Sequence, residues 1–227
     1  MKLNTKRTVL VGFAFLSICA FWQMYDNIIP LILQNTYHLG ETMTGAVMAL
    51  DNVLAIFLLP VFGMLSDKVH TKLGRRMPFI VAGTILAVIF MMLLPMIDNA
   101  EKARWSTGES FSNQVIFLAV LFFTLVSMGL YRSPAVALMP DVTPNHLRSR
   151  ANAVINLMGA VGGVYALIMI KVLVGKGETP DYLPLFASIA AVMAIAVGIL
   201  VITIRENKLR EEVEKAEAVN TEKVEEK

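Results

Sequence analysis

The sequence predicts an all-α membrane protein with six transmembrane helices. Of its 227 residues, 56% are hydrophobic and only 17% are charged, whereas a soluble domain carries about a quarter charged residues. A chain with a mean hydropathy of +0.63 would expose large apolar patches in water. Six runs also approach the roughly 20 apolar residues that a helix needs to cross a bilayer. The bilayer is therefore the expected solvent.

The six expected spans share an apolar composition and lack the two-residue alternation of membrane β-barrel strands. They are Val9–Leu33, Thr44–Leu65, Pro78–Ile97, Gln114–Met139, Ala151–Val174 and Leu183–Ile204. Lipid offers the backbone no hydrogen-bond partners, so these runs are expected to be helices. The basic residues before the first span resemble a signal peptide. Its apolar stretch is too long and no small-residue cleavage site follows, so we expect a retained helix.

Lysine and arginine in the short connections set the expected orientation. With the N-terminus inside, the inner segments hold Lys2, Lys6, Arg7, Lys68, Lys72, Arg75, Arg76, Arg148, Arg150 and the tail from Arg205. The outer segments hold only Lys102, Arg104, Lys171 and Lys176. We therefore expect a multi-pass protein of the plasma membrane with both termini in the cytoplasm.

The last residues differ from the rest in composition. Residues 205–227 contain eight Glu, six Lys or Arg and no aromatic residue. We expect residues 1–204 to form the transmembrane domain and residues 205–227 a charged cytoplasmic tail or linker, either a solvated helix that frays or a disordered segment. Contact of this tail with anionic lipid is an open alternative.

Three charged residues lie well inside the expected spans: Asp26, Asp51 and Arg132. A charge in lipid costs about 2.5–3.5 kcal/mol even on lenient insertion scales, so each is a candidate functional residue. Counted along straight helices, Asp26 and Asp51 lie about 25 Å and 24 Å from the inner end, and Arg132 about 13 Å. Contact between Asp26 and Arg132 therefore needs a tilted helix, or breaks at Pro30 and Pro134.

The residues around Asp26 fit a sugar-binding site. Trp22, Gln23 and Tyr25 lie just before it. An aromatic face beside a carboxylate and an amide suits the apolar face and the hydroxyls of a sugar. Trp22 and Tyr25 could instead be ordinary packing or membrane-interface aromatics.

Asn52 and Arg132 complete the candidate substrate-binding set. Asn52 could instead form hydrogen bonds between helices, as could Asn152 and Asn156. Glycines 159, 162 and 163 lie in the middle of the fifth span, far from any strand–helix turn. We therefore expect them to allow close helix packing rather than to form a phosphate-binding loop.

Asp26 and Asp51 are also candidate proton carriers. Loss of hydration favours the neutral form of a carboxyl group, so a carboxylate among apolar helices can take up and release a proton. A permanently paired structural acid is the alternative for either residue. The single cysteine, Cys19, excludes a disulfide framework and a cysteine-rich metal site.

Two short segments indicate an inverted repeat. Residues 25–30 read Tyr-Asp-Asn-Ile-Ile-Pro in the first span, and residues 131–134 read Tyr-Arg-Ser-Pro in the fourth. They lie at similar distances from the starts of spans that enter the membrane from opposite sides, as a three-plus-three inverted repeat requires. The shared residue types are few, so coincidence stays open.

The connection between the second and third spans identifies a family. It contains Gly63, then Asp67-Lys68, then Gly74-Arg75-Arg76 before Pro78. This pattern resembles the loop between helices 2 and 3 of major facilitator superfamily transporters. The long spacing before Gly-Arg-Arg and the Pro-Phe-Ile that follows it resemble two branches more specifically: the glycoside–pentoside–hexuronide:cation symporters and the proton-coupled sucrose carriers. Leu50-Asp51-Asn52 and the segment from Tyr131 to Asp141 extend the resemblance.

The resemblance implies a half of the major facilitator fold and a latch that responds to rocking between two halves. The residues carried over to the latch are Gly63, Asp67, Gly74, Arg75, Arg76 and Asp141. A basic loop that only fixes the topology is the alternative. Melibiose-type symporters carry two acids where this chain has Ala55 and Leu59, which cannot bind sodium. Proton coupling is therefore the expected form, with no cofactor besides the proton.

Family members have two six-helix halves that hold the substrate between them, so we expect a second half, as a homodimer or a separate chain. The leading interpretation is the N-terminal half of a proton-coupled sugar symporter that works by alternating access. An exporter of another solute is an alternative, although Gly159–Gly163 lacks the proline typical of drug exporters. A non-transporting membrane scaffold or a truncated remnant is another. We expect neither an enzyme nor a metal site, because His38, His70 and His146 fall in expected loops.

Overall fold

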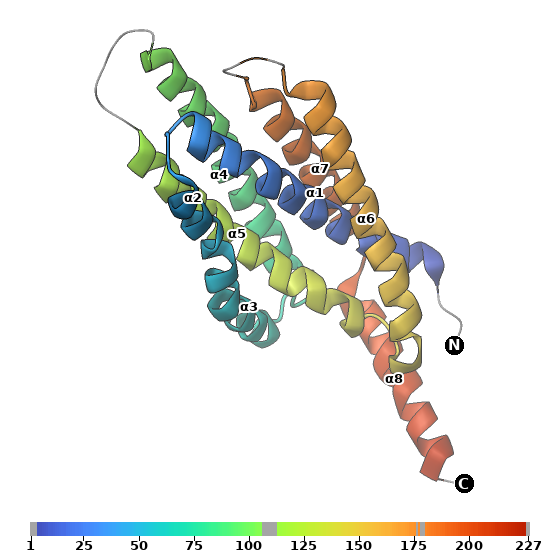
Figure 1. Cartoon of the computed structure of the whole chain (residues 1–227). Helices are drawn as coiled ribbons and strands as arrows, with labels where there is room; N and C mark the ends of the chain where they lie inside the picture. Colours follow the sequence, from blue (N-terminus) through green and yellow to red (C-terminus); the bar gives the residue numbers. More distant parts are fainter. Residues whose placement is uncertain (1–3, 106–112, 176, 178–179, 226–227) are drawn as a thin grey trace.

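A computed structural model describes residues 4–105, 113–175, 177 and 180–225, and its regular elements are helices (Figure 1). In chain order they are α1 (Thr5–Asn35), α2 (Glu41–Met48), α3 (Leu50–Lys68), α4 (Met77–Trp105), α5 (Gln114–Asp141), a 3-10 turn η1 (Asn145–Leu147), α6 (Arg148–Leu173), α7 (Leu183–Thr203) and α8 (Glu206–Glu225). Six helical segments of the described chain are long and apolar enough to cross a membrane, counting α2 and α3 as one. The prediction of six spans is confirmed.

The second span differs from the expected straight helix. It is interrupted at Ala49, between α2 and α3, so that Asp51 lies in the first turn of α3. A carboxylate is favoured in that position because the start of a helix carries a partial positive charge. The helices continue through Pro30 and Pro134, which were expected to supply breaks.

The helix packing has the symmetry of an inverted repeat. The main pairs in contact are α1 with α6 and α7, α5 with α3 and α4, and α4 with α7. Exchanging the first, second and third spans with the fourth, fifth and sixth converts each of these pairs into a pair of the same set, and α4 with α7 into itself. This arrangement agrees with the expected three-plus-three repeat.

Small and polar side chains hold the central helices together. A Cβ atom on Gly83 of α4 would collide with the backbone of Tyr131 in α5, and one on Gly162 of α6 would collide with the backbone of Leu16 in α1. The Tyr131 hydroxyl lies 2.6 Å from the Ser17 hydroxyl and donates to the Ala14 carbonyl oxygen, which joins α1 to α5. The expected close packing in the fifth span is confirmed at position 162.

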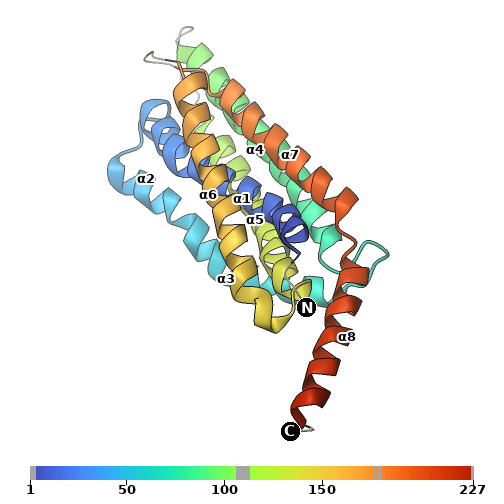
Figure 2. The same cartoon turned by 90° about the vertical axis from the view of Figure 1, so that its right-hand side faces the viewer.

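The bundle buries α1 and leaves α3 at its surface. Residues along the whole length of α1 belong to the hydrophobic core, among them Phe21, Tyr25 and Ile28. In α3, all of which the structure describes, Ser66 alone is buried. Figure 2 shows α4 and α7 along one side of the bundle, with α2, α3 and α6 towards the other. Of the three intramembrane charges, Asp26 of α1 is exposed, and Asp51 of α3 and Arg132 of α5 are half-buried.

One end of the bundle, here called the basic end, carries the α3–α4 loop, the α5–α6 turn, the chain's N-terminus and α8 (Figures 1 and 2). The expected tail is helical from Glu206 onward. Leu209 and Val213 of α8 are buried against the bundle, and Glu212 pairs with Arg7 at 2.8 Å. This part of the tail is therefore docked and ordered.

Candidate functional site

A groove of about 400 Å³ lies between α1 and α6. Its α1 wall consists of Cys19, Trp22, Gln23 and Asp26, and its α6 wall consists of Gly159, Ala160, Gly163, Val164 and Leu167. Its volume falls in the range of small-molecule sites, roughly 300–1,000 Å³. At Gly163 a Cβ atom would meet only the Gln23 Oε1 atom, at 3.7 Å, so the missing side chain leaves the groove open there.

A second, much smaller pocket of about 20 Å³ also has Trp22 in its lining. Asp51 of α3 and Arg132 of α5 line it as well. The Arg132 guanidinium lies 5.5 Å from the centre of the Trp22 ring, within the range of a cation–π contact. Trp22 thus belongs both to the groove that contains Asp26 and to the pocket that contains Asp51 and Arg132.

The structure separates Arg132 from Asp26. The two residues do not line a common pocket, and the described ion pairs do not join them. Arg132 shares its pocket with Asp51 instead, although straight-helix depths place these two residues about 11 Å apart. The depth estimate treated the spans as straight and parallel. Both counted stretches, Asp51–Asp67 of α3 and Arg132–Asp141 of α5, are continuous helix, so the interruption at Ala49 does not account for the difference.

Tyr25 lies in the core. It is 1% exposed, its ring stacks on Phe21 at 6.1 Å, and it meets Trp22 edge-on at 5.4 Å. It lines neither of the two pockets around Trp22, so the packing alternative describes its ring better than direct substrate contact does.

Two buried polar atoms near the groove have no hydrogen-bond partner among the described residues: Trp22 Nε1 and Tyr25 Oη. Buried polar atoms in native proteins are nearly always hydrogen-bonded, so these two are candidates to contact a ligand, water or another chain.

The asparagines do not join helices in the described structure. The Asn52 amide donates to its neighbour Asp51 at 2.9 Å, and its side chain is exposed. Asn152 and Asn156 lie exposed on α6, and the described hydrogen bonds include neither of them. The prediction of interhelical hydrogen bonds is therefore wrong for the described structure. All three asparagine side chains are exposed, on α3 and α6.

Five of the six latch candidates come together in one network at the basic end, and the sixth, Gly74, lies in the turn just before the two arginines. Arg75 pairs with Asp141 at 2.8 Å, and Arg76 bonds the other oxygen of Asp141 at 3.0 Å. Arg76 also pairs with Asp67 at 2.5 Å and donates to the Gly63 carbonyl oxygen at 3.2 Å. The ends of α3, α4 and α5 are thereby joined.

The α3–α4 loop requires an arginine at position 75 and a glycine at position 74. Burial lowers the pKa of the Arg75 guanidinium, but the hydrogen bond to Asp141 and the charges of Asp141, Asp67 and Glu206 outweigh burial, so the net pKa is raised. Gly74 has a φ of +126°, a conformation that residues with a side chain rarely adopt. The turn therefore delivers two permanently charged arginines to the carboxylates.

Sequence reasoning missed Glu206. Its side chain is 1% exposed, and its carboxylate accepts the backbone N–H groups of Arg75, Arg76 and Met77 at 2.9–3.1 Å. These groups lie at the start of α4, where N–H groups lack partners within the helix. A residue from the α7–α8 junction thus caps another helix. Glu206 follows the sixth span at the same side of the membrane as the α3–α4 loop, and this position could have indicated a contact between them.

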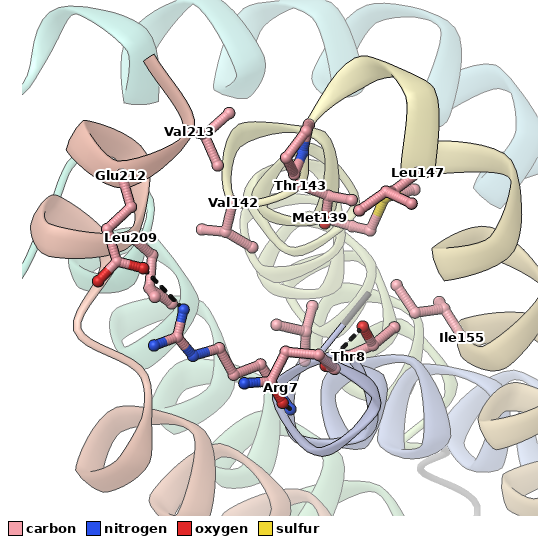
Figure 3. Close-up of a pocket in the computed structure, with 13 residues that line it drawn as sticks. Arg7, Thr8, Met139, Val142, Thr143, Leu147, Ile155, Leu209, Glu212 and Val213 are labelled. Atoms are coloured by element: carbon pink, nitrogen blue, oxygen red, sulfur yellow. Dashed lines mark hydrogen bonds and ion pairs between the residues drawn. The ribbon is translucent and has the colours of Figure 1, made fainter. Parts of the chain in front are cut away.

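α8 also covers a cavity of about 50 Å³ at the basic end, shown in Figure 3. Leu209 and Val213 of α8 face Val142 and Met139 of the α5 end across it, and the Arg7–Glu212 pair lies at one side. The Asn145 N–H donates to Glu217 at 3.0 Å and adds a further contact. The latch network and α8 therefore form a continuous layer at this end.

Comparison with known proteins gives a family match and a set of relatives. Residues 11–226 match the model of the Major Facilitator Superfamily. Sucrose transport protein SUT3 of Oryza sativa subsp. japonica is 24% identical over 151 residues, which cover 63% of this chain and 30% of that protein. Sucrose transport protein SUC4 of Arabidopsis thaliana is 35% identical over 116 residues, which cover 48% of this chain and 22% of that protein. The chain thus spans less than a third of the length of these relatives.

Proposed function

Because the chain belongs to the Major Facilitator Superfamily, we propose that it is the N-terminal half of a proton-coupled sugar symporter. In this proposal the sugar binds in the α1–α6 groove, stacked on Trp22, with Gln23 and Asp26 as hydrogen-bond partners. The sucrose transport proteins among its relatives support a sugar as substrate. Both termini lie in the cytoplasm, in agreement with the excess of lysine and arginine at the basic end.

The observation that carries the proposal is the set of charged and polar groups around Trp22. Asp26, Asp51 and Arg132 lie on membrane-spanning helices, yet the described ion pairs include none of them. Charged groups within a membrane are expected to face protein or a water-filled pathway. A cavity between two halves, filled by water or sugar, meets that requirement.

Asp51 is the proposed proton carrier and Arg132 its charged neighbour. Both line one small pocket, so protonation of Asp51 would change the electrostatic environment of Arg132 and of the Trp22 ring beneath it. Ala55 lines the same pocket and offers no oxygen ligand, which favours a proton over sodium as coupling ion.

The second half would cover α3 and the outer face of α6. These surfaces are exposed along the membrane, and the asparagines of α3 and α6 lie on them. The partner is another copy of the chain or a separate six-helix chain, and rocking between the halves would open and close the latch network.

The test is counterflow of radiolabelled sucrose and other sugars in proteoliposomes, using protein purified from its own membrane with any associated second half. Exchange should occur without a gradient, and a pH gradient should drive accumulation. Asp51→Asn should abolish accumulation and retain part of the exchange. Glu41→Gln, which removes an exposed acid at the start of α2, should behave like the unchanged protein.

Normal uphill uptake by Asp51→Asn would remove Asp51 from the coupling role. Failure of every sugar tested to exchange would contradict sugar transport, and exchange of another solute would identify the exporter alternative. Gly163→Leu should fill the groove and weaken sugar affinity, whereas Gly45→Leu, which also points into open space, should not.

A further inference from the structure

A second groove, of about 420 Å³, lies between α4 and α7. It runs from Val81 to Ile89 on α4 and from Ala194 to Ile202 on α7, or about 12 Å on each helix. Its lining is apolar except for the Thr84 hydroxyl, which donates to the Ile80 carbonyl oxygen within its own helix. The groove therefore offers a ligand only apolar contact.

The groove faces away from the polar half of the molecule. All three intramembrane charges lie on α1, α3 and α5, whereas α4 and α7 line the opposite side in Figure 2. Val81 lies only four residues from the start of α4, and Ile202 one residue before the end of α7. The groove therefore borders the hydrocarbon of the leaflet next to the basic end, where an acyl chain is the available apolar ligand.

Three cations lie around the same end of these two helices: Lys72, Arg205 and Lys208. All three are exposed, and none pairs with an acid in the described part of the chain. Asn207 donates to the carbonyl oxygens of Thr71 and Lys72, at 3.0 Å and 3.3 Å, so the α3–α4 loop is bound to the α7–α8 junction.

The acids closest in sequence to these cations are already engaged. Glu206 accepts three backbone N–H groups, Glu212 pairs with Arg7, and Glu211 pairs with Lys215. The junction between α7 and α8 thus presents positive charge at the level where lipid headgroups lie.

We propose that the α4–α7 groove is a binding site for a phospholipid with an anionic headgroup. One acyl chain occupies the groove, and the headgroup phosphate lies against Lys72, Arg205 and Lys208. The apolar lining of the groove binds the acyl chain, and the three cations favour a negatively charged headgroup. The site is independent of the proposed sugar groove, because the two lie on different helices.

Native mass spectrometry of the detergent-purified protein tests the site, with added phosphatidylglycerol or phosphatidylcholine of the same acyl chains. One phosphatidylglycerol should be retained in preference to phosphatidylcholine. Gly198→Leu should reduce retention of both lipids to background, because a side chain at position 198 meets no atom within 4 Å and enters the groove. Ala191→Leu, exposed on α7 outside the groove lining, is the matched control.

Charge variants test the headgroup. Replacing Lys72, Arg205 or Lys208 by Gln should weaken phosphatidylglycerol binding about fivefold for each cation removed and leave phosphatidylcholine unchanged. Lys215→Gln, which changes an exposed cation farther along α8, should have no effect. Equal retention of the two lipids, or equal retention by Gly198→Leu and the unchanged protein, would overturn the proposal.

Discussion

Charged side chains are paired with one another at the basic end of the bundle but not in its middle. At the basic end, Arg75, Arg76, Asp67 and Asp141 satisfy one another, and Glu206 accepts three N–H groups. In the membrane interior, Asp26, Asp51 and Arg132 lie beside pockets and have no ion-pair partner among the described residues.

Under the proposed function, this difference separates groups that hold the fold from groups that would contact a ligand. A satisfied network stabilises the arrangement in which it forms, so its loss should lower stability. The three membrane charges without an ion-pair partner among the described residues should contribute little to stability, and under the proposed function they would respond to a proton, a sugar or a second half.

The largest loss of stability in detergent is expected for Arg76→Gln. The Arg76 side chain is 6% exposed and bonds two carboxylates as well as the Gly63 carbonyl oxygen, so its removal leaves acceptors without their cation. Removing one partner of a fully buried pair costs about 3–5 kcal/mol, but the Asp67 side chain is 48% exposed, so we expect a loss of about 2–3 kcal/mol. Thermal unfolding should shift clearly to lower temperature. Arg150→Gln, at an exposed position of the same end, should leave it unchanged, and equal shifts in both variants would remove the special role of the network.

A smaller loss of stability is expected for Glu206→Gln. The amide retains one acceptor oxygen but loses the charge that favours the start of α4, which should cost about 1–2 kcal/mol. Hydrogen exchange at the amides of Arg75, Arg76 and Met77 should accelerate. Glu212→Gln breaks only an exposed pair with Arg7 and is the control. Unchanged exchange at the three amides would contradict the capping role.

Asp26→Asn should change the stability of this half by less than about 0.5 kcal/mol, in contrast to both variants above. Asp26 is exposed and lacks an ion-pair partner among the described residues, so its charge supports no contact that the fold needs. The measurement is the same unfolding assay, beside sugar exchange. A loss as large as that of Arg76→Gln would place Asp26 among the structural acids.

The smallest effect is expected for Lys215→Gln on α8. The hydrogen bond and charge of Lys215 lower the pKa of Glu211, and both groups are exposed. Removing Lys215 should return the pKa of Glu211 to its ordinary range without a measurable change in unfolding. A carboxyl titration followed by NMR reads this pKa directly. Because the pKa is lowered, any stabilisation by the pair is present above the ordinary pKa and lost as the pH falls through the lowered value.

Hydropathy was sufficient for the helices but not for their interruptions. The six spans follow from length and apolar content, since lipid admits few alternatives. The interruption at Ala49 has no glycine or proline at its position, whereas the prolines at 30 and 134 lie in continuous helices. Residue types read locally therefore predicted neither the interruption at Ala49 nor the continuity at the two prolines.

The latch residues were recognisable because a spaced motif carries them, whereas Glu206 lay among many acids that resemble a solvated tail. The spacing of Glu206, Leu209 and Val213 is that of one helix face and could have indicated docking. Trp22 and Asp26 both line the groove, but its α6 wall around Gly163 comes from a helix that no motif marked.

The cap on α4 has a consequence for dissecting the molecule. A chain cut after Ile204, the last apolar residue of the sixth span, would leave three amides at the start of α4 without their acceptor, whereas one cut after Asn207 would keep it. The smallest fragment that folds by itself should therefore extend a few residues past the membrane. The C-terminal limit of this fragment is set by the Glu206 carboxylate and not by the end of the apolar span.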